Sequence, residues 1–206
     1  MARPKVNLLS TDRIADAALD LVDSGEPFGV NALARRLSVT PSSLYNHVDG
    51  RDAIVELMRR RMVERDLDLV DPQPWEDLIP AVLRAQRRMY ARHPRLIPLI
   101  VDKTITDPLV IEQYDILATA LVEGGFPGGD VIAIIGVLDA FAIGFGLDLA
   151  SPADVWRPDV ETRTFGRLLE SAETGDTRSD HVFEIGVDML LESLRARLAR
   201  TGVQDA

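Results

Sequence analysis

The sequence predicts an all-α fold, and two observations support this prediction. Apolar residues recur at helical spacing along most of the chain, whereas no long stretch alternates between apolar and polar residues. Glycine and proline fall mainly between the apolar stripes, where helices end. The 206 residues include no cysteine, which excludes disulfides, thiol nucleophiles and thiolate metal sites. We therefore expect a packed helical protein with a core of ordinary size.

The first two helices are short and close together. Ser10 or Thr11 can cap a first helix, which must end before Gly25 because a glycine there favours termination. A second apolar stripe follows at Leu33 and Leu37, two positions on one helical face. Two compact helices are therefore expected within the first 37 residues.

A third and a fourth helix follow directly. Thr40 is a good N-cap, and Pro41 suits the first helical position because the missing N–H costs nothing there. Leu44 and Val48 lie one turn apart and predict an inward face. Gly50 can adopt a left-handed conformation, so the third helix should close there and a long amphipathic helix should run from 51 to 69.

The rest of the chain also predicts helices, after a break at 71–75. The Pro-rich sequence "DPQPW" gives the best domain boundary, which predicts domains at 1–70 and 71–206. Gly, Pro and apolar spacing place the later helices at 76–92, 95–103, 107–123, 130–150, 159–172 and 181–200.

One apolar run, "VIAIIGVLDAFAIGFGLDLA", is long enough to cross a membrane but contains Asp139 and Asp148. Because a membrane span rarely carries two carboxylates, we interpret it as a buried helix. The two aspartates could ligate a cation or meet an effector amine, or each could bond a neighbouring Thr, Tyr or Arg. The N-terminus lacks the apolar core of a signal peptide, so a cytoplasmic protein is expected.

Charge is unevenly distributed. The net charge is −10, which argues against indiscriminate coating of nucleic acid. Residues 1–51 hold six basic and six acidic residues, whereas the remaining 155 hold 17 basic and 27 acidic ones. The N-terminal segment can therefore present a local basic patch, made of Arg3, Lys5, Arg35, Arg36 and Arg51, that neutralises phosphates.

Two short helices separated by three residues are typical of a helix-turn-helix, whose second helix enters the major groove in DNA-binding versions. With Leu44 and Val48 inward, the outward surface carries Ser42, Ser43, Tyr45, Asn46 and His47. These hydroxyl, amide and ring groups suit base edges and phosphates, and several are poor helix formers. From spacing alone, a three-helix packing unit with a polar outer face is the alternative.

The segment "LARRLSVTPSSLYNHVDGRDAI" closely resembles the DNA-binding domain of TetR-family transcriptional regulators, whose signature is L-A-x-x-L-x-V-x-x-x-x-L-Y-x-H/Y-V/F-x-x-K/R. Every fixed position is met, over a match of about 50 residues, by Leu33, Ala34, Leu37, Val39, Leu44, Tyr45, His47, Val48 and Arg51. The resemblance implies a DNA-binding surface made of Asn31, Pro41, Ser42, Ser43, Tyr45, Asn46, His47 and Arg51. Tyr45 and His47 would contact phosphates, as would Arg51 at the start of the fourth helix. Pro41 stands where some relatives carry a base-reading polar residue, so the operator sequence does not follow.

From "WEDLIPAVL" onward the helix layout is similar to the C-terminal domain of the tetracycline-repressor subgroup, although less specifically. This similarity implies a homodimer built on a four-helix bundle and a central small-molecule effector. Candidate ligand-binding residues are Met62, Met89, Tyr90, His93, Thr104, Tyr114, Leu117, Phe141 and Phe145, although such a set is more often plain core. His93 alone is better explained as a helix-terminal residue before Pro94 than as a metal ligand. Histidines that bind tetracycline and its magnesium in relatives have no counterpart, so no metal or cofactor is implied.

Dimerisation also has support in the sequence itself. Gly136, Ala140 and Gly144 recur every four residues and would let another helix approach closely. The last helix has a broad apolar face at Val182, Ile185, Met189, Leu190, Leu194 and Leu198. Either stripe could instead belong to the core of one subunit. A dimer is favoured because two recognition helices about 34 Å apart read two half-sites of a palindrome.

The predicted function is therefore a homodimeric transcriptional repressor that a small-molecule effector releases from palindromic double-stranded DNA. No catalytic residues are predicted, and no membrane is involved. The main alternative is an all-helical small-molecule-binding protein or enzyme whose N-terminal helices only pack. A third is a regulator that has lost its effector and responds to a protein partner.

Overall fold

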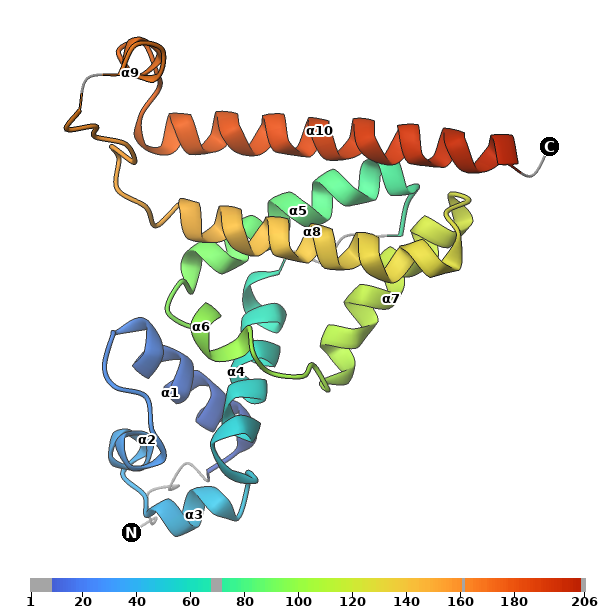
Figure 1. Cartoon of the computed structure of the whole chain (residues 1–206). Helices are drawn as coiled ribbons and strands as arrows, with labels where there is room; N and C mark the ends of the chain where they lie inside the picture. The colour runs from blue at the N-terminus through green and yellow to red at the C-terminus, as the bar shows by residue number, and fades with distance from the viewer. Residues whose placement is uncertain (1–8, 68–71, 161, 205–206) are drawn as a thin grey trace. The chain divides into compact units, whose positions relative to one another are not determined.

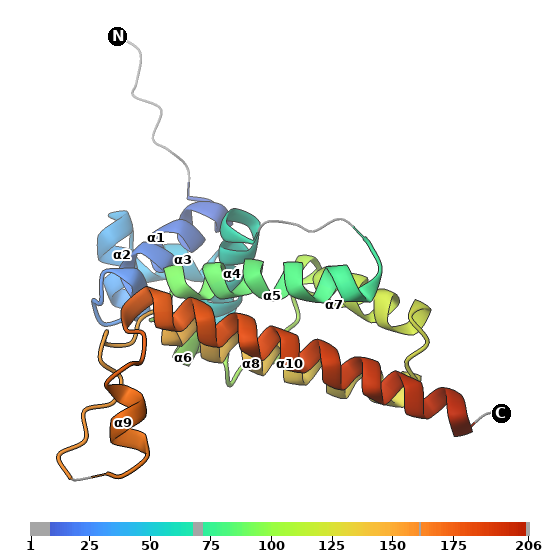
Figure 2. The same cartoon turned by 90° about the horizontal axis from the view of Figure 1, so that it is seen from above.

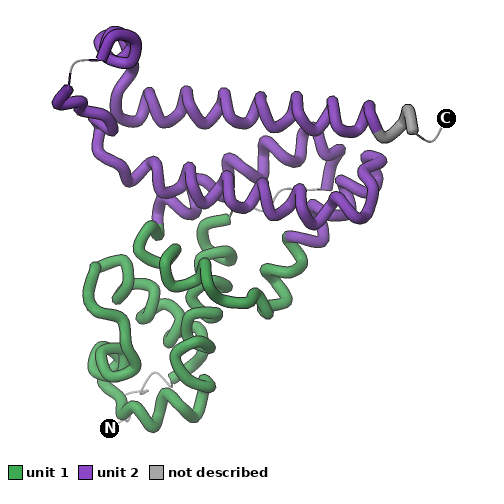
Figure 3. The backbone as a smooth tube through the Cα atoms, viewed as in Figure 1, with its two compact units in different colours: residues 1–68, 93–113 green, residues 69–92, 114–206 purple. Residues whose placement is uncertain are grey.

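The computed structural model describes residues 9–67, 72–160 and 162–204. Over those residues it contains helices and no strand, so the all-α prediction is confirmed. The chain forms two compact units (Figure 3): unit 1 combines residues 1–68 with 93–113, and unit 2 combines 69–92 with 114–206. The chain leaves unit 1 near the predicted boundary at 71–75, but it returns for residues 93–113 before entering unit 2 again.

Unit 1 contains α1 (Thr11–Asp23), α2 (Val30–Leu37), α3 (Pro41–Tyr45), α4 (Gly50–Asp66), α6 (Ile97–Ile100) and the first turns of α7 (Pro108–Glu123). α1 packs on α2 and α4, and α2 packs on α3 (Figure 1). Large apolar side chains of the first four helices fill this core, among them the fully buried Ile14, Leu19, Leu33, Leu44, Ile54 and Met58.

Local sequence explains where these helices begin and end. The Ser10 side chain accepts a hydrogen bond from the backbone N–H of Arg13, and the Thr40 hydroxyl accepts one from that of Ser43. Ser38 ends α2 in a left-handed conformation with φ of 57°, which turns the chain sharply toward α3. Gly50 adopts a φ of +88°, as predicted, at the first residue of α4.

Unit 2 contains α5 (Trp75–Arg92), the later turns of α7, α8 (Gly128–Asp148), α9 (Phe165–Leu169) and α10 (Gly175–Gln204). α5 packs closely on α8, and α10 lies beside both (Figures 1 and 2). Phe141 and Phe145 of α8 pack against Phe183 of α10, the first tilted and the second edge-on, with ring centroids 5.6 and 5.5 Å apart. An aromatic cluster therefore joins two long helices.

Three helices differ clearly from their predicted lengths. The helix predicted at 95–103 is reduced to the four residues of α6 (Ile97–Ile100). The helix predicted at 159–172 is only five residues long, since α9 has no buried residue and so no core against which a longer helix could pack. The last helix begins at Gly175, earlier than the predicted 181. Gly175 has a φ of 59°, a conformation that suits glycine, and it begins the helix six residues ahead of the predicted start.

The apolar run predicted as a buried helix forms α8, which is long and apolar enough to cross a membrane by length and composition. Only 33% of its most apolar window is buried. One face packs on α5, whereas Ile132, Gly136, Val137, Ala140 and Gly144 lie exposed on the other. The interpretation as a core helix therefore holds for one face only.

Candidate nucleic-acid interface

The outward surface of α3 is held in place by two buried residues. Leu44 is fully buried and Val48 nearly so, whereas Tyr45 is 54% exposed. The helix itself ends at Tyr45, earlier than predicted, and Asn46 and His47 continue in a turn. The backbone N–H of Val48 still donates to the carbonyl of Leu44 at 3.1 Å, so the predicted one-turn spacing is kept.

Not all polar side chains of α3 are equally available. Ser42, Asn46 and His47 are exposed, as is the ring of Pro41. Ser43 is only half-buried, and its hydroxyl lies 2.9 Å from the Thr40 hydroxyl, with which it shares a hydrogen bond. Ser43 therefore helps to cap α3, and its hydroxyl is less available to an external partner than that of Ser42.

α2 contributes a second set of exposed polar groups. Asn31 is exposed at the second residue of the helix. The guanidinium of Arg36 lies 3.9 Å from Asp20 and 3.6 Å from Glu26, so two carboxylates already partly offset its charge. Arg35 is exposed and forms no ion pair within the described residues. Of this adjacent pair, Arg35 is the better candidate for a phosphate contact.

Arg51 lies at the second residue of α4 and is exposed. Its guanidinium is 5.1 Å from the ring centroid of Phe28, a cation–π contact that positions the cation without neutralising it. Nothing in the spacing pointed to Phe28 as this support. Arg3 and Lys5, the other members of the predicted basic patch, lie outside the described residues.

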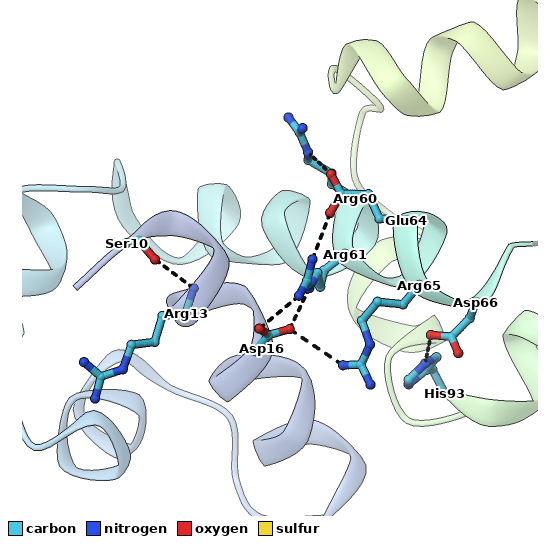
Figure 4. A network of polar contacts seen from close by, with 9 residues as sticks. All are labelled: Ser10, Arg13, Asp16, Arg60, Arg61, Glu64, Arg65, Asp66 and His93. Carbon is cyan, nitrogen blue, oxygen red and sulfur yellow. Dashed lines mark hydrogen bonds and ion pairs between the residues drawn. The ribbon is translucent and has the colours of Figure 1, made fainter. Parts of the chain in front are cut away.

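Ion pairs fix α4 to α1 behind this surface (Figure 4). Arg61 donates two hydrogen bonds to Asp16, at 2.6 and 3.1 Å, and Arg65 lies 3.7 Å from the same carboxylate. The hydrogen bond from Arg61 to Asp16 raises the pKa of that guanidinium, which therefore stays charged. The helix that follows the recognition turn is thus tied to the first helix of the unit.

A second set of contacts fixes α4 to residues 93–107. Arg59 is buried, and its guanidinium donates to the carbonyl of Ile100 at 2.6 Å and to that of Lys103 at 3.3 Å. It also pairs with Glu56 at 2.9 Å. Lys103 lies 3.4 Å from Asp52, near the start of the same helix. Residues 93–107 therefore brace α4 along most of its length.

His93 completes this brace at the other end of α4 (Figure 4). The ring is buried, with Nδ1 2.8 Å from Asp23 of α1 and Nε2 2.9 Å from Asp66 of α4. Arg95 donates to the carbonyl of Asp23 at 2.9 Å. Both ring nitrogens of His93 are occupied inside unit 1, an arrangement in keeping with the helix-terminal interpretation rather than with metal or ligand binding.

The sequence of α4 contains a signal for the burial of Arg59. Arg59 falls four residues after Val55 and four before Val63, so a cation interrupts the apolar stripe of α4. A charged residue in such a stripe is buried with a partner far from it in the sequence, and that partner was not visible. The burial of His93 is indicated more weakly, by a histidine directly before a proline.

The nine predicted ligand-binding residues do not fall in one unit. Met62, His93 and Thr104 belong to unit 1, whereas Met89, Tyr90, Tyr114, Leu117, Phe141 and Phe145 belong to unit 2. Met62, Met89, Tyr90 and Leu117 are buried, Tyr114, Phe141 and Phe145 are half-buried, and Thr104 is exposed. Within unit 2, Phe141 and Phe145 pack 4.5 Å apart. As a ligand site the set stays a prediction.

The sequence model of the family described as "Tetracyclin repressor-like, C-terminal domain" matches residues 70–198. This chain belongs to the TetR family. An HTH-type transcriptional regulator from Saccharopolyspora erythraea is 29% identical over 166 residues, 79% of this TetR-family chain and 69% of the relative. The HTH-type transcriptional repressor DrrR1 from Streptomyces coeruleorubidus is 25% identical over 161 residues, 76% of this chain and 57% of DrrR1.

A solved structure supports the same assignment of fold for this TetR-family chain. The TetR-family protein ActR from Streptomyces coelicolor, in complex with actinorhodin, matches with a TM-score of 0.76 and 22% identity. The match covers 93% of this chain and 97% of ActR. The helix-turn-helix surface described above therefore belongs to a TetR-family transcriptional regulator.

Proposed function

We propose that this protein is a homodimeric repressor that binds a palindromic operator and dissociates from it when a small-molecule effector binds. The observation that carries the proposal is the exposure of Ser42, Tyr45, Asn46 and His47 over the buried Leu44 and Val48. An outward face of hydroxyl, amide and ring groups suits base edges and phosphates. The name of DrrR1 as a repressor supports the direction of regulation.

The exposed apolar faces of α8 and α10 support a dimer. Ile132 of α8 is 74% exposed and Met189 of α10 is 65% exposed, with Val137 and Ile185 exposed nearby in the sequence. A Cβ atom added at Gly136 or Gly144 would meet nothing within 4 Å, so none of the described helices of the same chain covers that stripe. A second copy is the proposed occupant, because an apolar surface of this kind marks an interaction site and identical chains pair through identical faces.

Release by an effector needs a route to the recognition helix, and unit 1 contains one. Residues 93–107 are bonded to α4 at Asp52, Glu56, Arg59 and Asp66. A displacement of this segment would therefore move α4, whose first residue follows the recognition turn. An effector that binds one of two conformations more tightly shifts the population toward it. ActR in complex with actinorhodin is a ligand-bound example from the same family.

The test begins with selection of sequences from a random DNA library by the purified protein. We expect a palindrome, bound with an affinity that falls steeply as salt rises, because phosphate contacts release counterions. The double variant Tyr45→Ala with Arg51→Ala should weaken binding at least tenfold, while Arg157→Ala, an exposed arginine in unit 2, should not. If the double variant binds DNA as tightly as the unchanged protein, the alternative, in which the N-terminal helices only pack, would be favoured.

The effector is sought separately, by thermal shift of the protein with a small-molecule library. A compound that binds the folded protein raises the melting temperature, and the effector among such compounds should also reduce operator binding. By linkage, the operator should then weaken binding of that compound by the same factor. Operator binding with no responding compound would favour control by a protein partner.

A further inference from the structure

Unit 2 carries a groove that none of the predicted ligand-binding residues lines. It lies between the chain that leads into α5 and the face of α7 that carries Asp115, Thr119 and Glu123. Its volume is about 570 Å³, within the range of sites that hold drug-sized molecules. Trp75 and Ile116 contribute apolar surface to it.

The tryptophan side of the groove is fixed before any ligand arrives. The Trp75 indole is buried and packs edge-on against Phe126, with ring centroids 5.1 Å apart and planes at 86°. It also lies directly against Gly124, where an added Cβ would be 2.8 Å from the indole nitrogen and closer still to Cδ1. Since only glycine fits there, the close approach of α7's end to Trp75 defines this wall.

The opposite wall is negatively charged, and no basic residue is among the described residues that line it. Asp115, Thr119 and Glu123 are four residues apart, so they follow one face of α7. Neither carboxylate has a hydrogen bond or an ion pair to another residue in the described part of the chain. No lysine or arginine is among the described residues that line the groove.

The end of α7 adds to this negative potential. Glu123 is the last residue of the helix, and its final turn contains no basic residue. A helix C-terminus carries a partial negative charge, so a carboxylate at this position is locally unfavourable and a cation is favourable. The sequence thus gives up helix stability at the mouth of the groove, as expected where a site has a binding role.

We propose that this groove binds an organic cation with a flat apolar body, such as a protonated aromatic amine. The apolar surface of Trp75 and Ile116 would contact the body, while Asp115, Glu123 and the end of α7 would hold the ammonium. Thr119 offers a hydroxyl between the two carboxylates. The site is independent of DNA binding, so it does not rest on the repressor function.

Proflavine, a cationic acridine dye, is a suitable probe because its charge and flat rings have the stated chemistry. The full-length protein without DNA is titrated into the dye and followed by fluorescence anisotropy. We expect one dye bound per chain, with binding at least tenfold weaker in Asp115→Asn with Glu123→Gln. Thr119→Arg, which places a cation in the groove from an exposed position, should abolish binding.

The matched control removes the same charge elsewhere. Glu112→Gln with Asp159→Asn also changes two exposed carboxylates to amides, outside the groove. This control should bind proflavine as the unchanged protein does. Equal weakening in both double variants would mean general attraction to an acidic protein, and no weakening in either would place the dye elsewhere. Each of those results overturns the proposal, as would equally tight, groove-dependent binding of the anionic dye anilinonaphthalene sulfonate.

Discussion

Asp148 shows how a single carboxylate holds unit 2 together. It lies at the end of α8 and accepts hydrogen bonds from Nη2 of Arg178, at 2.8 and 2.9 Å, and from the hydroxyl of Ser179, at 2.5 Å. Of the interpretations open from the sequence, the structure supports bonding to a neighbouring arginine. Burial acts to raise the pKa of Asp148, but the bonds from Ser179 and Arg178 together outweigh it, so the pKa is lowered.

The lowered pKa predicts a pH-dependent effect of Asp148→Asn. A carboxyl group with a folded pKa below its unfolded value of about 3.9 stabilises the fold at neutral pH, and that stabilisation is lost as pH falls through the folded pKa. At pH 7 the variant should lower the free energy of unfolding by about 1–2 kcal/mol, modest because the side chain is 22% exposed. At pH 3 the difference should shrink toward zero.

Urea denaturation at both pH values, at one fixed protein concentration, measures this effect. Asp159→Asn is the matched control, because Asp159 is exposed and forms no ion pair within the described residues. A loss of stability that is the same at pH 7 and pH 3 would contradict the assigned role of the charge.

At this scale the sequence predicted the surface better than the interior. Tyr45, Asn46 and His47 could be assigned outward because Leu44 and Val48 fixed the direction of the turn through local spacing. Arg59 and His93 could not be assigned in the same way. The carbonyls that accept from Arg59 and the carboxylates that meet His93 lie between 27 and 70 residues away in the sequence. Local periodicity contains no information about which distant carbonyl or carboxylate will meet a buried cation.

Among the elements of unit 1, α4 is held in place from two directions by side-chain contacts with distant parts of the chain. Asp16 holds it from α1, and residues 93–107 hold it from the other direction through Arg59 and Asp66. The four residues of α6 would not be stable as an isolated helix, since a single turn cannot repay its nucleation cost. The guanidinium of Arg59 at the Ile100 carbonyl satisfies one group left open at the end of that turn.

Arg59→Met should therefore destabilise unit 1. Removing the guanidinium leaves the carbonyls of Ile100 and Lys103 without this donor and Glu56 without its cation, at an expected cost of about 2–4 kcal/mol in the free energy of unfolding. Denaturant unfolding followed by circular dichroism gives the value. Arg60→Met, on the exposed side of the same helix, should change little. Equal effects of the two variants would show that Arg59 is not specially important.

Element prediction succeeded where a helix has its own stripe and its own caps. α1, α3 and α5 begin within a residue of their predicted starts because Ser10, Thr40 and the Pro-rich turn before Trp75 are local signals. The predicted length of α9 and the predicted start of α10 were wrong, because no apolar stripe marks either one. There the helix length depends on packing and on the conformation of Gly175.

At the scale of the whole molecule, a second copy is proposed to cover the exposed faces of α8 and α10. Met189→Glu tests this, since the two-fold symmetry of a dimer would bring two buried charges into the interface. We expect the dimer dissociation constant to rise about 100-fold or more, because burying an unpaired charge costs several kcal/mol.

Sedimentation equilibrium measures that constant directly. Val101→Glu is the matched control: Val101 is an apolar residue of unit 1 that is similarly exposed. A dimer unaffected by Met189→Glu, or one weakened equally by Val101→Glu, would place the interface elsewhere.

The two-domain organisation was predictable only in part. The Pro-rich break at 71–75 is a local feature, whereas the return of residues 93–113 to unit 1 depends on contacts such as those of His93 with Asp23 and Asp66. The sequence predicted the stripe of Gly136 and Gly144 as a surface that another helix could approach closely. Whether that surface faces the core or the solvent depends on where the neighbouring helices lie.

The return of residues 93–113 to unit 1 has a consequence for protein engineering. A chimera that grafts only the first 70 residues onto another regulator would separate α1–α4 from residues 93–113, which hold α4 within unit 1. The graft would need two separate gene segments, 1–68 and 93–113, to carry Arg59 and His93 together with their partners. In this protein, the segments to be exchanged are set by the contacts of the folded unit and not by their order along the gene.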